Sequence, residues 1–369
     1  MQIKIPVYQP SLNGNEIKYA EECIRSTWIS SRGEFIDRFE GQFSKLTSTK
    51  YATSVCNGTV ALHAALLALG IGAGDEVIVP TLTYVASVNA IRYVGATPVF
   101  CDSETAYWQI DASKMESLIT SRTKAIMVVH LYGHPSPMVE ICGLAKKYNL
   151  FIVEDCAEAL GARIGTRWVG GFGHIATYSF FGNKTITTGE GGMVATNDSQ
   201  LAAQVKKIKS QGLSGTREYW HDIIGHNFRM TNLTAAIGCA QMEKFDIFLK
   251  EKRKLAIRYQ EALKDTPLVF LGEKAGYTNA YWMVSAIASN ENELRGLREH
   301  LKLKGIETRP LFPPVHLMPM YGRDVGLYPV AESISCCGLN LPSWPMLPQS
   351  DFQLIVDSIQ EFYAQRQDV

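Results

Sequence analysis

The sequence predicts an α/β protein with a mostly parallel sheet covered by helices, followed by a smaller α+β domain. The chain has 369 residues, which is long enough for two domains and a large core. Between about residues 50 and 200, short apolar segments alternate with helical patterns, as is typical of parallel sheets buried on both faces. The pattern changes further along the chain. We therefore expect a large α/β domain over residues 1–245 and a small α+β domain over residues 246–369.

The first alternating elements follow an Asn-Gly-Thr sequence. We expect Asn57 to lie near the N-cap of a helix that ends at Leu69, because Ala61, Leu62 and Ala65 fall at helical spacing. A proline ends the next apolar segment, which is typical of a short strand. In order, the pattern predicts a strand over 76–80, a helix over 84–93, strands over 97–100 and 124–130, a helix over 138–148 and a strand over 150–153.

The later elements differ in order and length. A single long helix over residues 230–254 would carry the chain out of the first domain. We find no repeat and no linker rich in proline or serine, so the two domains are expected to pack closely. The other predicted elements are strands over 175–180, 192–196 and 281–288 and helices over 200–211, 291–304 and 351–364.

The composition argues against several classes of protein. Lysine plus arginine and aspartate plus glutamate number 36 each, so the formal net charge is zero and we expect no partner of nucleic acid or anionic membrane. The sequence has no apolar run long enough for a signal peptide or a membrane-spanning helix. The eight cysteines are scattered without a Cys-x-x-Cys pair, so we expect buried thiols and a cytoplasmic protein.

Lys184 is the strongest candidate for a catalytic residue. It lies between the apolar segment 175–181 and a cluster of glycines at positions 189, 191 and 192. A lysine that forms a Schiff base must be partly desolvated so that its amine can be neutral. The glycines would let the backbone turn tightly and approach a cofactor closely. This setting indicates a site for pyridoxal 5′-phosphate (PLP).

A PLP site also needs an acid beside the pyridine nitrogen and donors for the phosphate. Asp155 ends an apolar strand, and ligands of open α/β sheets bind at the carboxyl ends of strands. A lone aspartate there is more often a cap or an ion-pair partner, but its combination with Lys184 favours the cofactor. The helix after Asn57 could hold the phosphate through its first-turn N–H groups and the Thr59 hydroxyl. Ser179 could add a second hydroxyl.

Other patterns indicate little. His130 and His134 follow a strand and do not share a helix face, so we expect no metal site. The lysine loop lacks the spacing of a P-loop. The glycines at 70, 72 and 74 follow a helix and precede a strand, which is the reverse of the dinucleotide-binding order and disfavours an NAD-dependent oxidoreductase. The sequence contains no Gly-x-Ser-x-Gly hydrolase motif.

Taken together, several separate motifs resemble one family, the DegT-type nucleotide-sugar aminotransferases. The resemblance covers nearly the whole chain and implies the aspartate aminotransferase fold (fold type I), with PLP as cofactor and pyridoxamine phosphate in the catalytic cycle. The motifs that carry it are the segments 57–59, 154–159, 179–184 and 189–192, and the segments 5–12, 26–33, 219–222, 227–232 and 340–345 are most similar to the branch that aminates GDP-4-keto-6-deoxy-D-mannose.

The resemblance implies a role for each matching residue. Lys184 would hold PLP as a Schiff base and then serve as the acid–base of the proton shift, while Asp155 would pair with the pyridinium nitrogen. Tyr84 would stack on the pyridine ring. Glu158 stands where many relatives carry Gln or His, and it could contact the phenolic oxygen of PLP only if one of the two groups is protonated. Phosphate contacts are expected from Gly58, Thr59 and Ser179, and from Asn227 toward the cofactor of the other subunit of a homodimer.

The resemblance also implies a reaction. L-Glutamate would donate its amino group to C4 of GDP-4-keto-6-deoxy-D-mannose, giving GDP-perosamine for O-antigen and lipopolysaccharide biosynthesis. Two alternatives stay open, namely a sister aminotransferase for a UDP- or dTDP-linked 3- or 4-keto sugar and a PLP-binding regulatory protein without turnover. The lysine argues against the dehydratases of the family, which carry histidine there. The substrate is expected to contact an N-terminal loop with Trp28, Ser30 and Arg32, together with Arg309 and His316.

Overall fold

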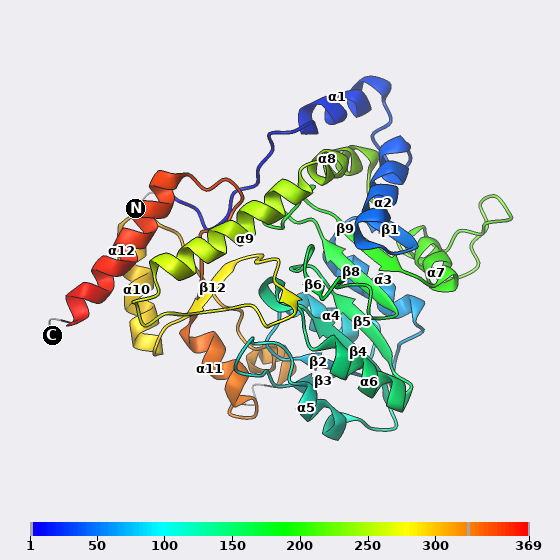
Figure 1. The fold of residues 1–369 in the computed structure, drawn as a ribbon. Helices are drawn as coiled ribbons and strands as arrows, with labels where there is room; N and C mark the ends of the chain where they lie inside the picture. Colours follow the sequence, from blue (N-terminus) through cyan, green and yellow to red (C-terminus); the bar gives the residue numbers. More distant parts are fainter. Residues whose placement is uncertain (1–2, 323–324, 368–369) are drawn as a thin grey trace.

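A seven-stranded sheet forms the centre of the larger part of the molecule. The computed structural model describes residues 3–322 and 325–367 (Figure 1). The strand order is β1-β9-β8-β5-β4-β2-β3, in which β9 runs antiparallel to both of its neighbours and the other pairs are parallel. The prediction of a mostly parallel sheet is therefore confirmed. The strands are β1 (Tyr51–Val55), β2 (Glu76–Pro80), β3 (Thr97–Cys101), β4 (Thr123–Val129), β5 (Phe151–Asp155), β8 (Ile175–Ser179) and β9 (Gly192–Thr196).

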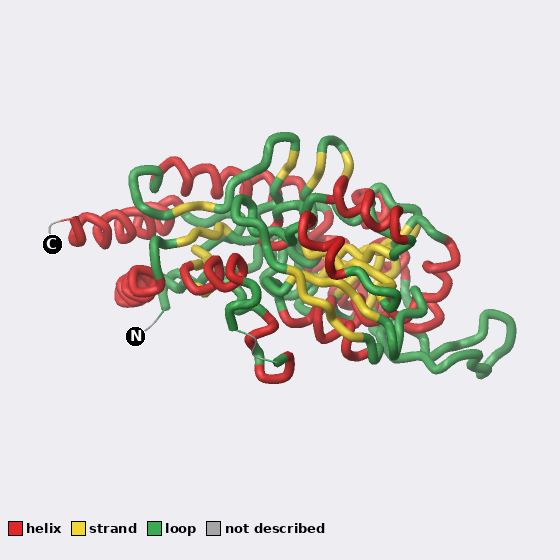
Figure 2. Tube along the Cα trace, turned by 90° about the horizontal axis from the view of Figure 1, so that it is seen from below, coloured by secondary structure: helices red, strands yellow, loops and turns green. Residues whose placement is uncertain are grey.

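Helices cover both faces of this sheet, because successive strand residues point to opposite sides. On β2, the buried Val77 and Val79 pack in one core with Leu66 of α3, whereas Ile78 between them packs with Ile141 of α6 on the other face. Figure 2 shows helices on both sides of the strands. The covering helices are α2 (Glu34–Thr47), α3 (Gly58–Ala68), α4 (Val85–Tyr93), α5 (Ala112–Met115), α6 (Met138–Tyr148), α7 (Ser199–Lys209) and α8 (Asn232–Met242).

The predicted single helix over 230–254 is wrong, because the chain forms two helices there. The first is α8, and the second is α9 (Phe245–Ala262). Between them the carboxylate of Glu243 accepts hydrogen bonds from Asn15 (2.7 Å), from Tyr19 (2.6 Å) and from Arg38 (2.9 Å). These bonds fix the end of α8 against α1 (Glu16–Ser26) and α2. The chain then turns, and α9 leaves in a new direction toward the C-terminal part (Figure 1).

A second, antiparallel sheet lies beyond α9, in the order β10-β12-β14-β13. Ile5 forms a bridge to Ile306 and lies in the same core, so the N-terminal segment packs on the C-terminal part of the chain. The predicted domain boundary near residue 245 stays a prediction. The elements here are β10 (Val269–Phe270), β12 (Val284–Ile287), β13 (Arg309–Pro310), β14 (Gly338–Leu341), α10 (Glu291–Leu303), α11 (Pro329–Cys337) and α12 (Gln349–Gln367).

Smaller elements join the two sheets. A three-stranded sheet combines β6 (Arg163–Ile164) and β7 (Arg167–Trp168) with β11 (Tyr277–Thr278), which comes from the C-terminal part. The loop 211–226 follows α7 and projects from the body of the molecule in both views (Figures 1 and 2). In residues 3–322 and 325–367, every helix is too short or too polar to span a bilayer. Four short 3-10 helices are η1 (Glu116–Leu118), η2 (Leu131–Gly133), η3 (Val315–Leu317) and η4 (Pro319–Tyr321).

Candidate active site

A cavity of about 340 Å³ lies at the carboxyl ends of the central parallel strands. The last residues of β4, β5 and β8, which are Val129, Asp155 and Ser179, all line it. This is the edge at which open α/β sheets bind ligands. The cavity brings together seven of the residues that the sequence indicated for a cofactor: Gly58, Thr59, Tyr84, Asp155, Glu158, Ser179 and Lys184.

Lys184 reaches the cavity from the loop between β8 and β9. Its side chain is only 12% exposed, and its Nζ atom lies 4.0 Å from Oε1 of Glu158 and 3.9 Å from the centre of the Trp282 ring. Burial lowers the pKa of the Lys184 amine, while Glu158 and Asp155 oppose this shift. A lowered pKa increases the neutral fraction of the amine, which is the form that attacks a carbonyl group.

Asp155 is held by two hydrogen bonds at the end of β5. Its Oδ2 atom accepts from the hydroxyl of Ser87 on α4 (2.7 Å), and its Oδ1 atom accepts from the N–H of Ala157 (3.1 Å). Burial raises the pKa of the Asp155 carboxyl, and these two bonds and Lys184 oppose the rise. A buried carboxylate of this kind gains stability from a cation in the cavity, such as a protonated pyridine nitrogen.

Glu158 lies in the turn after β5 and faces the amine of Lys184. Its Oε2 atom accepts a hydrogen bond from the backbone N–H of Tyr132 (2.7 Å). Burial raises the pKa of Glu158 to about 7, against the opposing effect of Lys184. Near neutral pH a substantial fraction of this side chain is therefore protonated. That fraction meets the condition for a contact with a phenolic oxygen, because a protonated carboxyl can donate a hydrogen bond.

The N-terminus of α3 forms the cradle for an anion. The side chain of Asn57 caps this helix by accepting from the N–H of Val60 (2.9 Å), and the first helical turn faces the cavity. A Cβ atom on Gly58 would lie 2.7 Å from the Cβ atom of Ser179, so a glycine is required for this close approach. First-turn N–H groups have no partner inside a helix, and together with the helix dipole they bind phosphate groups.

These groups fit PLP. The partly neutral amine of Lys184 suits a Schiff base, the buried Asp155 suits the pyridinium nitrogen, and the N-terminus of α3 suits the phosphate. Tyr84, at the N-cap of α4, is 56% exposed and presents its ring at the cavity, where it could cover a flat ligand. The donor set, its spacing and its charges therefore match this cofactor.

Four of the other predicted residues lie outside the cavity. Asn227 follows the projecting loop, and its Oδ1 atom accepts from Arg229 (3.1 Å). Trp28, Ser30 and Arg32 form the loop between α1 and α2, where Trp28 is 58% exposed and borders a separate hollow on the surface. Their proposed contacts with the cofactor or substrate stay predictions.

The two remaining substrate candidates differ in burial. Arg309 lies on β13 with an exposed side chain that pairs with Glu307 (2.6 Å). His316 is fully buried, and its two ring nitrogens lie within hydrogen-bond distance of Thr81 (2.5 Å) and Glu332 (3.1 Å). His316 is therefore held inside the protein and is not among the residues that line the cavity. Its role toward the substrate stays a prediction, as does that of Arg309.

The sequence reasoning missed several cavity residues. Ser87 lies one helical turn after Tyr84, so its spacing could have indicated a shared face. Trp282 and Phe312 come from the C-terminal part and form one wall of the cavity. They had no local signal, because they are about 100 residues or more from the lysine loop along the chain.

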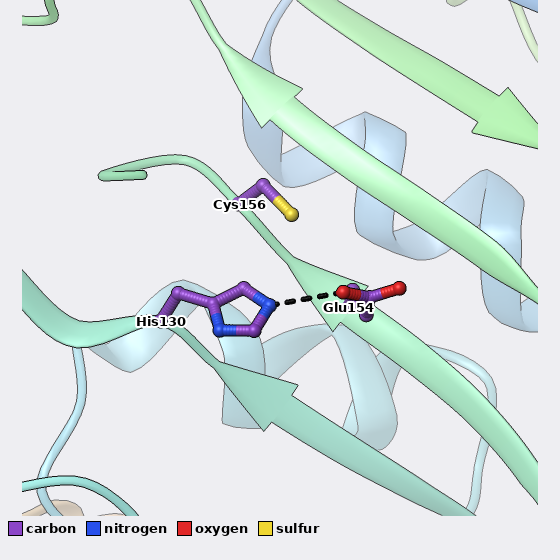
Figure 3. A group of neighbouring side chains, drawn as sticks. All are labelled: His130, Glu154 and Cys156. Atoms are coloured by element: carbon purple, nitrogen blue, oxygen red, sulfur yellow. Dashed lines mark hydrogen bonds and ion pairs between the residues drawn. The ribbon is translucent and has the colours of Figure 1, made fainter. Parts of the chain in front are cut away.

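Next to Asp155 in the sequence, Glu154 and Cys156 form a group of possible metal ligands with His130 (Figure 3). The Nε2 atom of His130 is 3.1 Å from Glu154, and its Nδ1 atom accepts from the N–H of Ser136 (3.0 Å). The carboxylate of Glu154 also accepts from three backbone N–H groups, those of Gly170, Phe172 and Gly173. The lone pairs of His130 and Glu154 are thus used in hydrogen bonds, and we interpret the group as a structural network.

Fold and site together define a PLP-dependent aminotransferase. The chain belongs to the DegT/DnrJ/EryC1/StrS aminotransferase family, whose model matches residues 10–360. It is 54% identical over 362 residues to a GDP-perosamine synthase of Escherichia coli O157:H7, which covers 98% of this chain and 99% of the relative. It is 46% identical to a GDP-perosamine synthase of Vibrio cholerae, with 97% and 99% covered. The aminotransferase TlmJ of Streptoalloteichus hindustanus has a similar structure, with a TM-score of 0.93 at 29% identity, covering 98% of this chain and 100% of TlmJ.

Replacing Gly58 with alanine should weaken cofactor binding. The new Cβ atom would lie 2.7 Å from that of Ser179, which forces the phosphate cradle apart. Overpacking of this kind costs about 1–3 kcal/mol, so we expect the affinity of the apoprotein for PLP to fall about tenfold or more. Titration of the apoprotein with PLP, followed by absorbance, measures this. Gly41→Ala is the matched control, because a Cβ atom there meets open space. Equal affinities in the two variants would contradict the assignment.

Replacing Glu158 with glutamine should change the pH dependence of the reaction. Glu158 has its pKa raised to about 7, so it loses its proton, and its ability to donate, as the pH rises through that value. A glutamine side chain donates at every pH. We expect the rate of the wild type to decline as the pH rises through about 7, and the Glu158→Gln variant to lose that inflection. The measurement is the pH profile of kcat/KM for glutamate. The same inflection in both proteins would exclude Glu158 as its source.

Proposed function

We propose that this protein transfers the amino group of L-glutamate to C4 of GDP-4-keto-6-deoxy-D-mannose and so forms GDP-perosamine. The observation that carries the proposal is the buried amine of Lys184, which shares one cavity with Glu158, with Asp155 and with the N-terminus of α3, where a phosphate can bind. The choice of sugar nucleotide is supported by the two relatives named GDP-perosamine synthase, which are 54% and 46% identical over almost the full chain.

The residues of this chain divide the work of the reaction. PLP, when bound, supplies an electron-withdrawing ring that stabilises negative charge at the substrate carbon. We assign to Lys184 the task of accepting the proton that leaves this carbon and of returning it at the neighbouring position. One base on one face can serve both half-reactions, and such proton transfer contributes roughly 10²–10⁴-fold. The lowered pKa of the Lys184 amine favours the neutral form, which can accept a proton.

Asp155 and the α3 cradle have binding roles in this proposal. The carboxylate of Asp155 would keep the pyridine nitrogen protonated, which preserves the electron-withdrawing character of the ring. Its two hydrogen bonds, from Ser87 and Ala157, fix the orientation of the carboxylate. Gly58, Thr59 and Ser179 would hold the phosphate, and Tyr84 would cover the ring. These contacts orient the reacting carbon toward Lys184.

The proposal includes a homodimer with sites completed across the interface. Asn227 lies outside the cavity of its own chain, next to the projecting loop 211–226. That loop carries Tyr219 and Ile224, which are 92% and 93% exposed. Exposed apolar side chains on a projecting loop are typical of a surface that docks on a partner. A second copy would bring Asn227 to the phosphate, and the loop with Trp28 and Arg32 to the sugar nucleotide.

We also infer a cytoplasmic location and a place in O-antigen and lipopolysaccharide biosynthesis. In the structure the cysteines are free thiols, several of them buried, as is typical of reducing compartments. In the described residues, no helix is long and apolar enough to cross a membrane. The sugar product would be consumed by a glycosyltransferase, since an amino sugar linked to a nucleoside diphosphate is an activated donor.

The proposed reaction can be tested in two steps. Purified protein is first loaded with PLP and treated with L-glutamate, and 2-oxoglutarate is measured. The keto sugars linked to GDP, UDP and dTDP are then supplied in turn, and the products are identified by mass spectrometry. We expect amination of the GDP-linked 4-keto sugar and at least a tenfold preference for it over the others. Lys184→Ala should lose about 10³-fold or more of the turnover, because both the Schiff base and the proton carrier are removed.

The outcomes of this test separate the alternatives. A preference for the UDP- or dTDP-linked sugar would identify a sister aminotransferase. If the protein binds PLP but forms no 2-oxoglutarate, this result would favour the alternative of a PLP-binding regulatory protein without turnover. Near-normal turnover by Lys184→Ala would exclude Lys184 as the reacting amine.

A hybrid dimer tests the shared site. A Lys184→Ala subunit and an Asn227→Ala subunit are co-expressed with different tags, and the hybrid is isolated on two affinity columns. Each parent dimer should be strongly impaired. The hybrid has one site with both Lys184 and Asn227 and one site with neither, so we expect about half of the wild-type rate per dimer. A hybrid as inactive as its parents, or a fully active monomer in light scattering, would refute the shared site.

A further inference from the structure

Among the residues that the structure describes, Lys252 is a buried amine with no carboxylate at ion-pair distance. It lies on α9 with a side chain that is 1% exposed, although lysine is rarely buried. Its Nζ atom donates to two backbone carbonyls, those of Trp282 (2.9 Å) and Ser343 (2.7 Å). Burial, and to a smaller extent the nearby charge of Lys184, lower the pKa of Lys252 to about 7. Burial of an amine costs free energy unless hydrogen bonds offset it, so these two contacts stabilise the buried position of Lys252.

The first contact holds a strained bend. Tyr281 has a φ angle of 48°, which is in the left-handed region and costs of order 1–3 kcal/mol for such a residue. Such a conformation persists when surrounding bonds determine it. The N–H of Tyr281 donates to the side chain of Asn279 (2.7 Å), and the carbonyl of the next residue, Trp282, accepts from Lys252. The bend is therefore fixed from both sides.

The bend places the ring of Trp282 against the reacting amine. The indole N–H donates to the carbonyl of Asn183 (2.7 Å), and the centre of the ring is 3.9 Å from Nζ of Lys184. The ring also stacks with Tyr132 and Phe312, at 6.2 and 6.1 Å between ring centres. The face of an aromatic ring stabilises a neighbouring cation. The position of Trp282 thus affects both where the amine lies and how readily it is protonated.

The second contact of Lys252, with the carbonyl of Ser343, is connected to Lys184 through the N-terminal segment. The N–H of Ser343, whose carbonyl Lys252 holds, donates to the carbonyl of Val7 (3.1 Å). The next residue, Tyr8, donates its hydroxyl to the carbonyl of Lys184 (2.6 Å), and its ring lies 5.1 Å from Nζ of Lys252. One route therefore ends at the side chain of Lys184 and the other at its backbone.

We propose that Lys252 is a positioning residue for the amino-transfer reaction, which clamps the Trp282 and Ser343 segments so that Lys184 is held at the working position. This inference rests on the proposed role of Lys184 as the reacting amine. Lys252 itself touches neither the cavity nor the reacting atoms. It acts through Trp282 on one side and through Tyr8 on the other.

The test compares Lys252→Met with Lys254→Met. Methionine has similar length but donates no hydrogen bond, and Lys254 is an exposed residue on the same helix. Misplacement of a catalytic group by about 1 Å can cost about 10²-fold. We expect kcat to fall about 10–100-fold in Lys252→Met, with KM for glutamate changed less than about threefold, while Lys254→Met matches the wild type. Circular dichroism and PLP binding identify the folded protein that is used.

A double-mutant cycle with Trp282→Phe distinguishes positioning from a general structural role. Phenylalanine keeps a ring but loses the bond to Asn183. If Lys252 acts through Trp282, the double variant should be about as slow as the slower single variant, whereas independent effects multiply. A second readout needs no turnover. In the apoprotein, the pH dependence of acetylation of Lys184, measured by peptide mass spectrometry, should shift in Lys252→Met and stay unchanged in Lys254→Met.

Several results would overturn the proposal. These are wild-type kcat in Lys252→Met, multiplicative effects in the cycle, or an unchanged labelling profile of Lys184. If Lys252→Met does not fold, Lys252→Arg takes its place, because it retains donors for the carbonyls and should recover most of the rate. Failure of Lys252→Arg to recover any rate would also contradict the positioning role. An inactive wild type would instead refute the proposed function, so the two failures are distinguishable.

Discussion

The removal of the Lys184 amine from water is the constraint on which the rest of the site depends. An exposed lysine is almost fully protonated at neutral pH and is a poor nucleophile. Here the amine lies inside a cavity at the edge of a buried parallel sheet, where burial lowers its pKa. Glu158 and Asp155 oppose this shift, because each carboxylate favours the cationic form. The fold thus provides an amine with a larger neutral fraction than an exposed lysine has.

The same burial produces a set of mutually dependent charges. It raises the pKa of Asp155 and of Glu158 while it lowers that of Lys184 and of Lys252, so each group is shifted toward its neutral form. A cationic ring nitrogen beside Asp155 would favour the carboxylate there. An anionic phosphate at the N-terminus of α3 would in turn be stabilised by the helix dipole. Cofactor binding would therefore offset part of the electrostatic cost of burying these groups.

Much of this arrangement could be predicted from sequence, wherever the determining contacts are local. Asn57 caps α3 through an N–H three residues away, and β9 begins at the last residue of a glycine cluster, so both were predicted at the correct positions. The motifs also indicated Lys184 and Asp155, which the structure brings together in one cavity. The break between α8 and α9 was missed because Glu243 is held by Asn15, more than 200 residues away. Trp282 was missed for the same reason, since a long-range fold alone brings it to Lys184.

Two adjacent acids at the end of β5, Glu154 and Asp155, have different environments because the strand directs them to opposite faces of the sheet. Successive residues of a strand point to opposite faces, so Glu154 and Asp155 cannot both face the cavity. Glu154 is used in the network with His130 and with the backbone of residues 170–173, and this network fixes the strand end. The N–H of His130 also donates to the carbonyl of Asp155 (3.1 Å). The bonds of Glu154 and of the adjacent strand thus fix the backbone of Asp155, while the bonds from Ser87 and Ala157 orient its carboxylate at the cavity.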